Sequence, residues 1–94
     1  MQIINLEFEK SQTKLAGNPF GRQVYSEQVK NKINYNDEVT FIFPERIDGI
    51  ATSFIQGFFA DMVKNIGITG IKNMVTIQSS IPNLKNIVLY NLEV

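Results

Sequence analysis

The stretch VTFIFPERIDGIATSFIQGFFADMV, residues 39–63, contains the two clearest structural signals in the chain, a buried strand followed by a helix. The strand is predicted over residues 38–43, where apolar and polar side chains alternate. Ile42 falls on the face opposite Phe41, and apolar residues on both faces are typical of a central strand that is covered on each side. Pro44 ends the strand, because proline cannot donate a hydrogen bond to a neighbouring strand.

The second half of the stretch predicts an amphipathic helix. Its apolar residues recur every three or four positions and form one broad stripe. Ser53 precedes the stripe and Gln56 follows three residues later, which is typical of a capping box at a helix N-terminus. Gly67 stands where a glycine ends a helix. The stripe consists of Ile55, Phe58, Phe59, Met62, Val63 and Ile66.

Toward the N-terminus, the pattern predicts a strand, a polar connector and a helix. Residues 4–8 alternate between apolar and polar side chains, as in a half-buried strand, and residues 11–17 are polar. Asn18 and Pro19 are expected to begin a helix, as a cap and a first helical residue. Gly21 weakens the first turn, which favours a slightly later start. The apolar positions of this helix are Phe20, Val24, Val29 and Ile33.

Toward the C-terminus, residues 74–78 predict a third strand and residues 79–82 a break. The apolar residues of the segment 84–92 fit a helix, although alternation from Val88 to Val94 also fits a strand, and the helix is preferred. The resulting order is β-α-β-α-β-α. It predicts one α/β domain over residues 1–94, with a small mixed or mainly parallel sheet and helices packed on it.

Composition excludes several kinds of chemistry. The chain has 94 residues, of which 44% are hydrophobic, and this is enough for one core. It has no histidine and no cysteine. Serine–histidine triads, zinc fingers and thiol nucleophiles are therefore excluded. We expect a protein that is not an enzyme and that uses neither a metal nor another cofactor.

Charge and hydropathy limit the expected partners and the expected location of the protein. Nine basic and nine acidic residues give a formal net charge of zero, without a lysine or arginine cluster. Direct binding of nucleic acid is therefore not expected, whereas near-zero net charge favours self-association. No signal peptide and no membrane-spanning run is predicted. The expected location is the cytoplasm, with no membrane partner.

The segment 45–54 is the candidate functional site. It joins the carboxyl end of the predicted central strand to the N-terminus of the strongest helix, where ligands bind in open α/β sheets. Backbone N–H groups at such a helix start favour anions. The hydroxyls of Thr52 and Ser53 are therefore candidates to bind a phosphate or to carry one. The commoner role of such residues remains an alternative, in which Ser53 caps the helix and Thr52 supports the turn.

A resemblance to a known family points to the same place. Phe41-Ile42-Phe43, a short loop, residues 50–54 and an apolar helix together resemble the STAS-like domains of unknown function. The predicted helix with Gly21-Arg22 resembles the first helix of that family, so the resemblance extends over residues 20–92. These domains are similar to bacterial anti-sigma-factor antagonists, in which a partner kinase phosphorylates a serine at this turn.

The resemblance implies that Ser53 is the phosphorylated position, or Thr52 after a shift of one residue. Antagonists usually have Asp-Ser-Ser-Gly here, and this chain differs by Ala51 at the acidic place and Phe54 at the glycine place. The implied function is a non-catalytic regulatory module that binds a protein partner, such as a kinase-like ATPase. The residues expected to contact that partner are Asp48, Gly49, Ile50, Phe54 and Phe58.

Other interpretations belong to different classes of protein. The small size and the absent catalytic groups also fit a phage or mobile-element protein that inhibits a host enzyme, such as a nuclease of bacterial immunity. A small enzyme would need a carboxylate site, for which Glu45, Asp48 and Asp61 are the weak candidates.

Two further features of the sequence are candidates for a role at the surface. Arg22 is either an anion ligand or a surface residue that pairs with Glu27. The wide apolar face around Phe58 and Phe59, or the edge of a strand, is a candidate surface for a homodimer.

Overall fold

Three parallel strands form the main sheet of the computed structural model, which describes residues 1–93. They are β1 (Gln2–Asn5), β3 (Val39–Ile42) and β5 (Val75–Gln78), in the spatial order β1-β3-β5. Ile4, Phe41 and Ile77 are aligned across the sheet. The predicted central strand is therefore confirmed, with one neighbour on each side.

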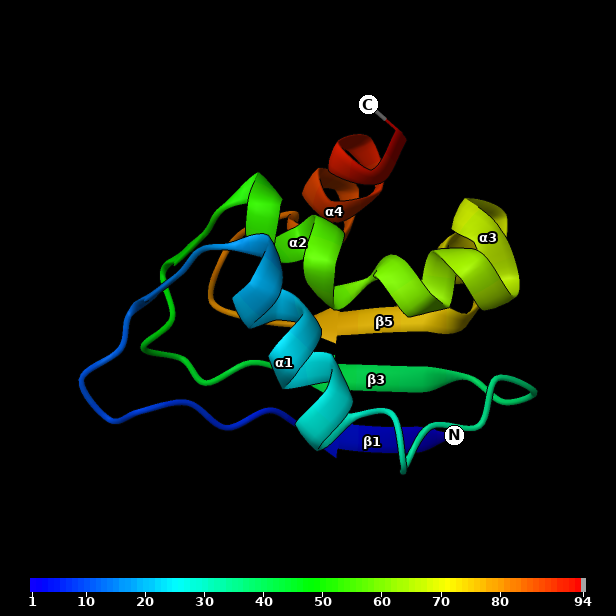
Figure 1. Cartoon of the computed structure of the whole chain (residues 1–94), viewed down its shortest axis with the longest axis horizontal. Coiled ribbons are helices and arrows are strands. Elements are labelled where there is room, and N and C mark those ends of the chain that lie inside the picture. The colour runs from blue at the N-terminus through cyan, green and yellow to red at the C-terminus, as the bar shows by residue number, and fades with distance from the viewer. Residues whose placement is uncertain (94) are drawn as a thin grey trace.

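Four helices accompany the sheet, as Figure 1 shows. They are α1 (Asn18–Gln28), α2 (Thr52–Phe58), α3 (Ala60–Met74) and α4 (Leu84–Glu93). In this view α1 crosses in front of the main sheet, while α2 and α4 lie above β5. None of the four has both the length and the apolar character that crossing a bilayer requires, within the part of the chain that is described. The predicted α/β class, with a small parallel sheet and helices packed on it, is confirmed.

A second, very short parallel pair lies beside the main sheet. Its strands are β2 (Lys14–Leu15) and β4 (Gly49–Ile50). The sequence predicted only a polar connector over residues 11–17, so β2 was missed. A strand of two residues has no alternation of its own, and this pair exists only because the fold brings the two segments together.

The main sheet is covered on one face only. Phe41 points to the helices and contacts the rings of Phe58 and Phe59, at centroid distances of 5.3 and 6.3 Å. On the other face Ile3 is 61% exposed, and Ile42 is only partly buried. The prediction that both faces are covered was therefore wrong. An apolar residue on the open face is not enough to require a second layer of helices.

Two glycines allow α1 and α2 to cross in close contact. A Cβ atom on Gly21 would meet the Phe54 carbonyl oxygen and lie 2.7 Å from the Phe58 nitrogen. A Cβ atom on Gly57 would meet the Asn18 carbonyl group in the same way. The predicted late start of the first helix was wrong, because α1 begins at Asn18 and Gly21 is needed for packing.

The aromatic side chains between these helices and the sheet form the centre of the core. Phe58 contacts Phe59 at a centroid distance of 4.9 Å and Phe54 at 5.9 Å. Each aromatic pair of this kind adds about 0.5–1.5 kcal/mol beyond the area that it buries. The residues that are fully buried include Leu15, Val29, Phe41, Ile47, Phe54, Ile55, Phe58, Phe59, Met62, Ile71 and Val75.

The boundaries of several helices differ from the predictions. The long helix predicted up to Gly67 is divided at Phe59, which separates α2 from α3. Gly67 interrupts α3 with a φ of 70° and a ψ of 173°, but helical structure resumes and continues to Met74. The first helix ends at Gln28, whereas the sequence predicted an end near residues 34–37 and assigned Ile33 to the helix. At the C-terminus, the helix is confirmed and the alternative strand was wrong.

Alanine at Gly21 or Gly57 is expected to destabilise the protein strongly. The new methyl group has no space against the backbone of the facing helix, and overpacking of this kind costs about 1–3 kcal/mol or more. The free energy of unfolding from urea titration is the measurement. Gln56→Ala, at an exposed position of α2, is the matched control and should change stability by less than about 0.5 kcal/mol. Equal stability of all three variants would show that the helices do not cross in this way.

Candidate functional site

The turn between β3 and α2 is held in place by the segment that precedes α1. The Asp48 N–H donates to the Thr13 carbonyl oxygen at 2.9 Å, and the Ala51 N–H donates to the Leu15 carbonyl oxygen at 2.8 Å. Ile47, which precedes the hydrogen-bonded segment, is fully buried. We define the turn surface as Lys14, Asp48, Gly49, Ile50, Thr52 and Ser53, which lie on β2, on or next to β4, and in the first turn of α2.

Ser53 joins the starts of two helices. Its Oγ accepts a hydrogen bond from the Gly17 N–H at 3.0 Å. Gly17 is the N-cap residue of α1 and has a φ of 99°, which a glycine adopts easily. Ala51 is the N-cap of α2, and no side chain caps that helix. The predicted capping role of Ser53, and the capping box with Gln56, were therefore wrong.

Thr52 presents a second hydroxyl beside Ser53. Both residues are exposed. Among residues 1–93, the Thr52 hydroxyl forms no hydrogen bond to another group of the chain. The two hydroxyls thus differ, because the hydroxyl of Ser53 is hydrogen-bonded to the start of α1 and the hydroxyl of Thr52 has no such bond within residues 1–93.

An ion pair crosses the turn surface. The Nζ atom of Lys14 lies 2.6 Å from Oδ1 of Asp48, and both side chains are largely exposed. The Lys14 hydrogen bond is the main cause that lowers the pKa of the Asp48 carboxyl below its ordinary value. The Lys14 side chain passes close to Gly49, where a Cβ atom would lie 2.7 Å from the lysine Cδ. Gly49 and Ile50 are partly buried.

Two of the residues expected to contact a partner lie in the core instead. Phe54 is 1% exposed and Phe58 is 0% exposed. Their assignment to a partner surface is corrected, because neither ring is accessible. The apolar face of α2 is covered by α1 and the sheet, so it also provides no homodimer surface. Helical spacing identified the wide apolar face. It did not show that α1 and the sheet together bury that face.

The three carboxylates considered for catalysis do not form one site. Glu45 lies in a hollow with Gln78 and Ser80, whereas Asp61 lies in another hollow with Arg22. Asp48 is on the turn surface. In the described part of the chain, no group of three acidic, histidine or cysteine residues is arranged to hold a metal ion.

Arg22 has a partner within its own helix. Its Nε donates to Oδ1 of Asn18 at 2.8 Å, and Glu27 instead accepts from Gln23 at 3.3 Å. The predicted Arg22–Glu27 pairing was therefore wrong.

A pair of tyrosines beside the hollow that contains Arg22 and Asp61 was not predicted from the sequence. The hydroxyls of Tyr25 and Tyr35 are hydrogen-bonded to each other. Burial, and then the bond to Tyr35, raise the pKa of the Tyr25 hydroxyl far above its ordinary value. Burial and the bond to Tyr35 thus both favour the neutral form of Tyr25.

No family model, no curated protein and no solved structure matches this chain. The resemblance to STAS-like domains therefore stays a prediction. The same holds for both functions that were considered, the regulatory module and the inhibitor of a host enzyme.

Replacement of Ser53 by alanine is expected to release the start of α1. The Gly17 N–H loses its acceptor, and the loss of one hydrogen bond costs about 0.5–1.5 kcal/mol. Urea titration measures the cost, and amide hydrogen exchange at Gly17 shows where it arises. Thr52→Ala is the control, with a smaller effect and no faster exchange at Gly17. If Gly17 exchanges equally in both variants, the bond does not hold the helix start.

The carboxyl of Asp48 is expected to titrate at a higher pH once Lys14 is removed. A folded-state pKa that is depressed adds stability above the unfolded pKa, and this stability is lost as the pH falls through the folded pKa. Lys14→Ala should therefore raise the Asp48 pKa toward its ordinary value, measured by NMR titration of the carboxyl carbon. Lys72→Ala, on α3, should leave it unchanged. An equal pKa in both variants would contradict the ion pair.

Proposed function

We propose that this protein is a non-catalytic regulatory module that binds a protein partner through the turn surface. We further propose that phosphorylation of Ser53 or Thr52 switches the binding. The observation that carries the proposal is the Ser53 hydroxyl, which is exposed and also accepts a hydrogen bond from Gly17 at 3.0 Å. A chemical change at this one atom therefore reaches the start of a second helix.

The chemistry of a phosphoryl group supports a switch at this position. A phosphoserine carries about −1.5 to −2 charges at neutral pH. On Ser53 it replaces the hydroxyl by an ester oxygen and adds bulk next to the Gly17 N–H. The turn surface also contains Lys14 and Asp48, which form an ion pair with an N–O distance of 2.6 Å. A phosphate added to the same surface is expected to attract Lys14 and to repel Asp48.

Phosphorylation of Thr52 would act differently. Its hydroxyl has no partner within residues 1–93, so a phosphate there adds charge without breaking the Ser53–Gly17 bond. Modification at position 52 is thus expected to change only the charge of the surface. Modification at position 53 is expected to change both the charge and the attachment of α1.

Two features of the sequence support the proposed function. The chain lacks histidine and cysteine, and so lacks the commonest general base and the thiol nucleophile. The turn resembles the phosphorylated turn of anti-sigma-factor antagonists. On this resemblance, a kinase-like ATPase is the proposed partner.

Quantitative capture from the source cells tests the surface. Wild-type protein and the Asp48→Lys variant are used as bait, with Glu38→Lys as the matched charge change at the opposite end of β3. We expect the wild type and Glu38→Lys to capture similar amounts of a partner. Asp48→Lys should capture about tenfold less, because of like-charge repulsion or loss of the ion pair with Lys14. Equal recovery with all three baits would contradict binding through the turn surface.

Modification is tested separately on the same material. The protein is incubated with the captured ATPase and ATP, and phosphorylated positions are mapped by mass spectrometry. We expect phosphate on Ser53 or Thr52, and its loss in the double variant Thr52→Ala/Ser53→Ala. Phosphate only at other positions, or none, would contradict the switch.

A further inference from the structure

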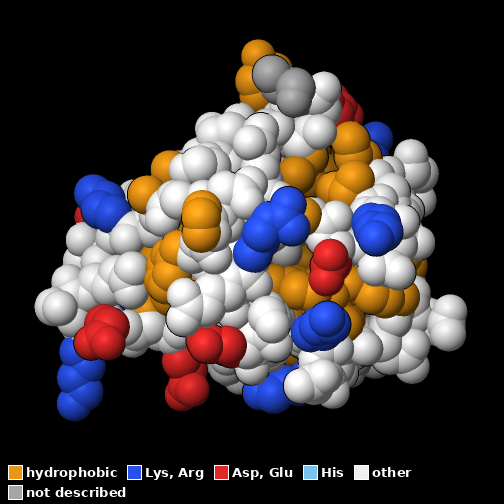
Figure 2. Space-filling model, in the orientation of Figure 1, with side chains coloured by type: hydrophobic (Ala, Val, Ile, Leu, Met, Phe, Trp, Pro, Cys, Tyr) orange, Lys and Arg blue, Asp and Glu red, His pale blue; other side chains and the backbone are white. Residues whose placement is uncertain are grey.

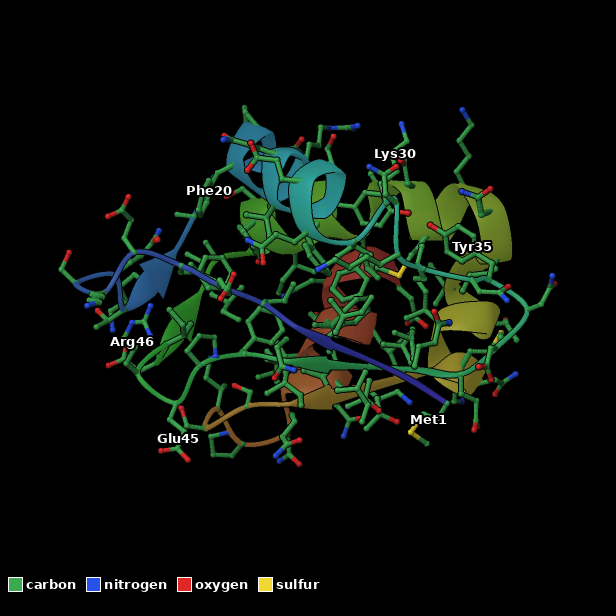
Figure 3. The ribbon with its side chains drawn as sticks, turned by 90° about the horizontal axis from the view of Figure 1, so that it is seen from below. Met1, Phe20, Lys30, Tyr35, Glu45 and Arg46 are labelled. Carbon is green, nitrogen blue, oxygen red and sulfur yellow. The ribbon has the colours of Figure 1, made fainter. Side chains whose placement is uncertain are left out.

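A groove lies between α1 and the segment that follows β1. Its volume is about 380 Å³. In Figure 3, Phe20 at the start of α1 and Arg46 appear on opposite sides of this segment, and the groove is on the side of Phe20. The lining residues are Glu7, Phe8, Glu9, Gln12, Phe20, Val24, Glu27 and Gln28.

The floor of the groove is aromatic and is fixed to the core. Phe8 and Phe20 are partly buried, and their ring centroids are 6.3 Å apart. Both rings contact the buried Phe54, at 6.4 and 5.6 Å. Phe8 also stacks on Phe43 with an interplanar angle of 7°. The accessible sides of Phe8 and Phe20 therefore form a preorganised apolar platform.

The rim of the groove is acidic. Glu7 and Glu9 come from the segment after β1, and Glu27 comes from α1, whereas no lysine or arginine lines the groove. Within residues 1–93, neither of the two ion pairs uses any of these three carboxylates. Figure 2 views the molecule from the side of α1 and shows several acidic side chains, with a basic one beside them, at the lower left, where Figure 1 places the segment after β1. The rim therefore gathers negative charge on a chain whose net charge is zero.

The segment on the rim is held rigidly. The Gln28 amide bonds to both backbone groups of Glu7, at 2.8 Å each. From the other side, Arg46 donates to the carbonyl oxygens of Phe8 and Glu9 at 2.6 and 2.8 Å. The positive charge of Arg46 is thus directed to the backbone, and it does not pair with a carboxylate of the rim.

We infer that this groove binds an arginine side chain of a protein partner, presented beside an apolar residue. A planar guanidinium stacks on aromatic faces and forms bidentate hydrogen bonds with carboxylates, and these are the two chemistries that the groove offers. A lysine ammonium is more strongly hydrated and stacks less well. The neighbouring apolar residue covers the remaining area of Phe8 and Phe20. The inference does not depend on phosphorylation of the turn surface.

NMR titration of the full ¹⁵N-labelled chain tests this inference with defined peptides. The probe is the acetylated and amidated hexapeptide of alternating Leu and Arg. Three matched peptides replace Arg by Lys, Arg by Glu, or Leu by Gly. We expect amide shifts limited to residues 7–12 and 20–28 with the Leu/Arg peptide. The Lys peptide should bind several-fold more weakly, and the other two should cause no saturable shifts.

A triple variant, Glu7→Gln/Glu9→Gln/Glu27→Gln, tests the role of the rim. These substitutions keep the shape of exposed side chains, so the fold is expected to be retained, and the unperturbed amide spectrum of β3 verifies this. Affinity for the Leu/Arg peptide should fall about tenfold. The control variant carries Glu38→Gln/Glu45→Gln/Glu93→Gln and should bind like the wild type.

Three outcomes would overturn the inference. They are equal affinity for the Arg and Lys peptides, shifts located outside the groove, and unchanged affinity of the triple variant. The amides of residues 48–53 should not shift in any of these titrations. The outcome is therefore independent of whether the turn surface binds a partner.

Discussion

The close crossing of α1 and α2 is the constraint on which the other features depend. Gly21 and Gly57 let the two backbones meet, because a Cβ atom on either would collide with the facing helix. This crossing buries Phe58 against the sheet and brings the start of α1 to the first turn of α2. Ser53 can then bond to Gly17 at 3.0 Å. A larger residue at either glycine would separate these helix starts as well as open the core.

The same crossing connects the two proposed binding surfaces. Phe54 follows Ser53 in the chain and lies under the groove, where its ring contacts Phe8 and Phe20. Both surfaces are therefore built on the same packed element, α2.

The sequence predicted those features that depend on local periodicity. The strand around Phe41 and the C-terminal helix were predicted, because alternation and helical spacing are visible in one segment. The pairing of β2 with β4, the packing role of Gly21 and the bond from Ser53 to Gly17 were not predicted. Each of these joins segments that lie far apart in the sequence. The assignment of Phe54 to a partner surface followed from its place in the predicted turn, and the sequence did not show that the ring packs against Phe20 of α1.

Amide hydrogen exchange of the chain phosphorylated at Ser53 tests the central claim most directly. The claim is that a phosphate at this position acts on the start of α1 through the hydrogen bond to Gly17. The predicted result is an exchange rate at Gly17 that differs from that of the unmodified chain, with unchanged exchange at Phe41 in the central strand. The chain phosphorylated at Thr52 should retain the original exchange at Gly17. Unchanged exchange at Gly17 after phosphorylation of Ser53 would contradict the account.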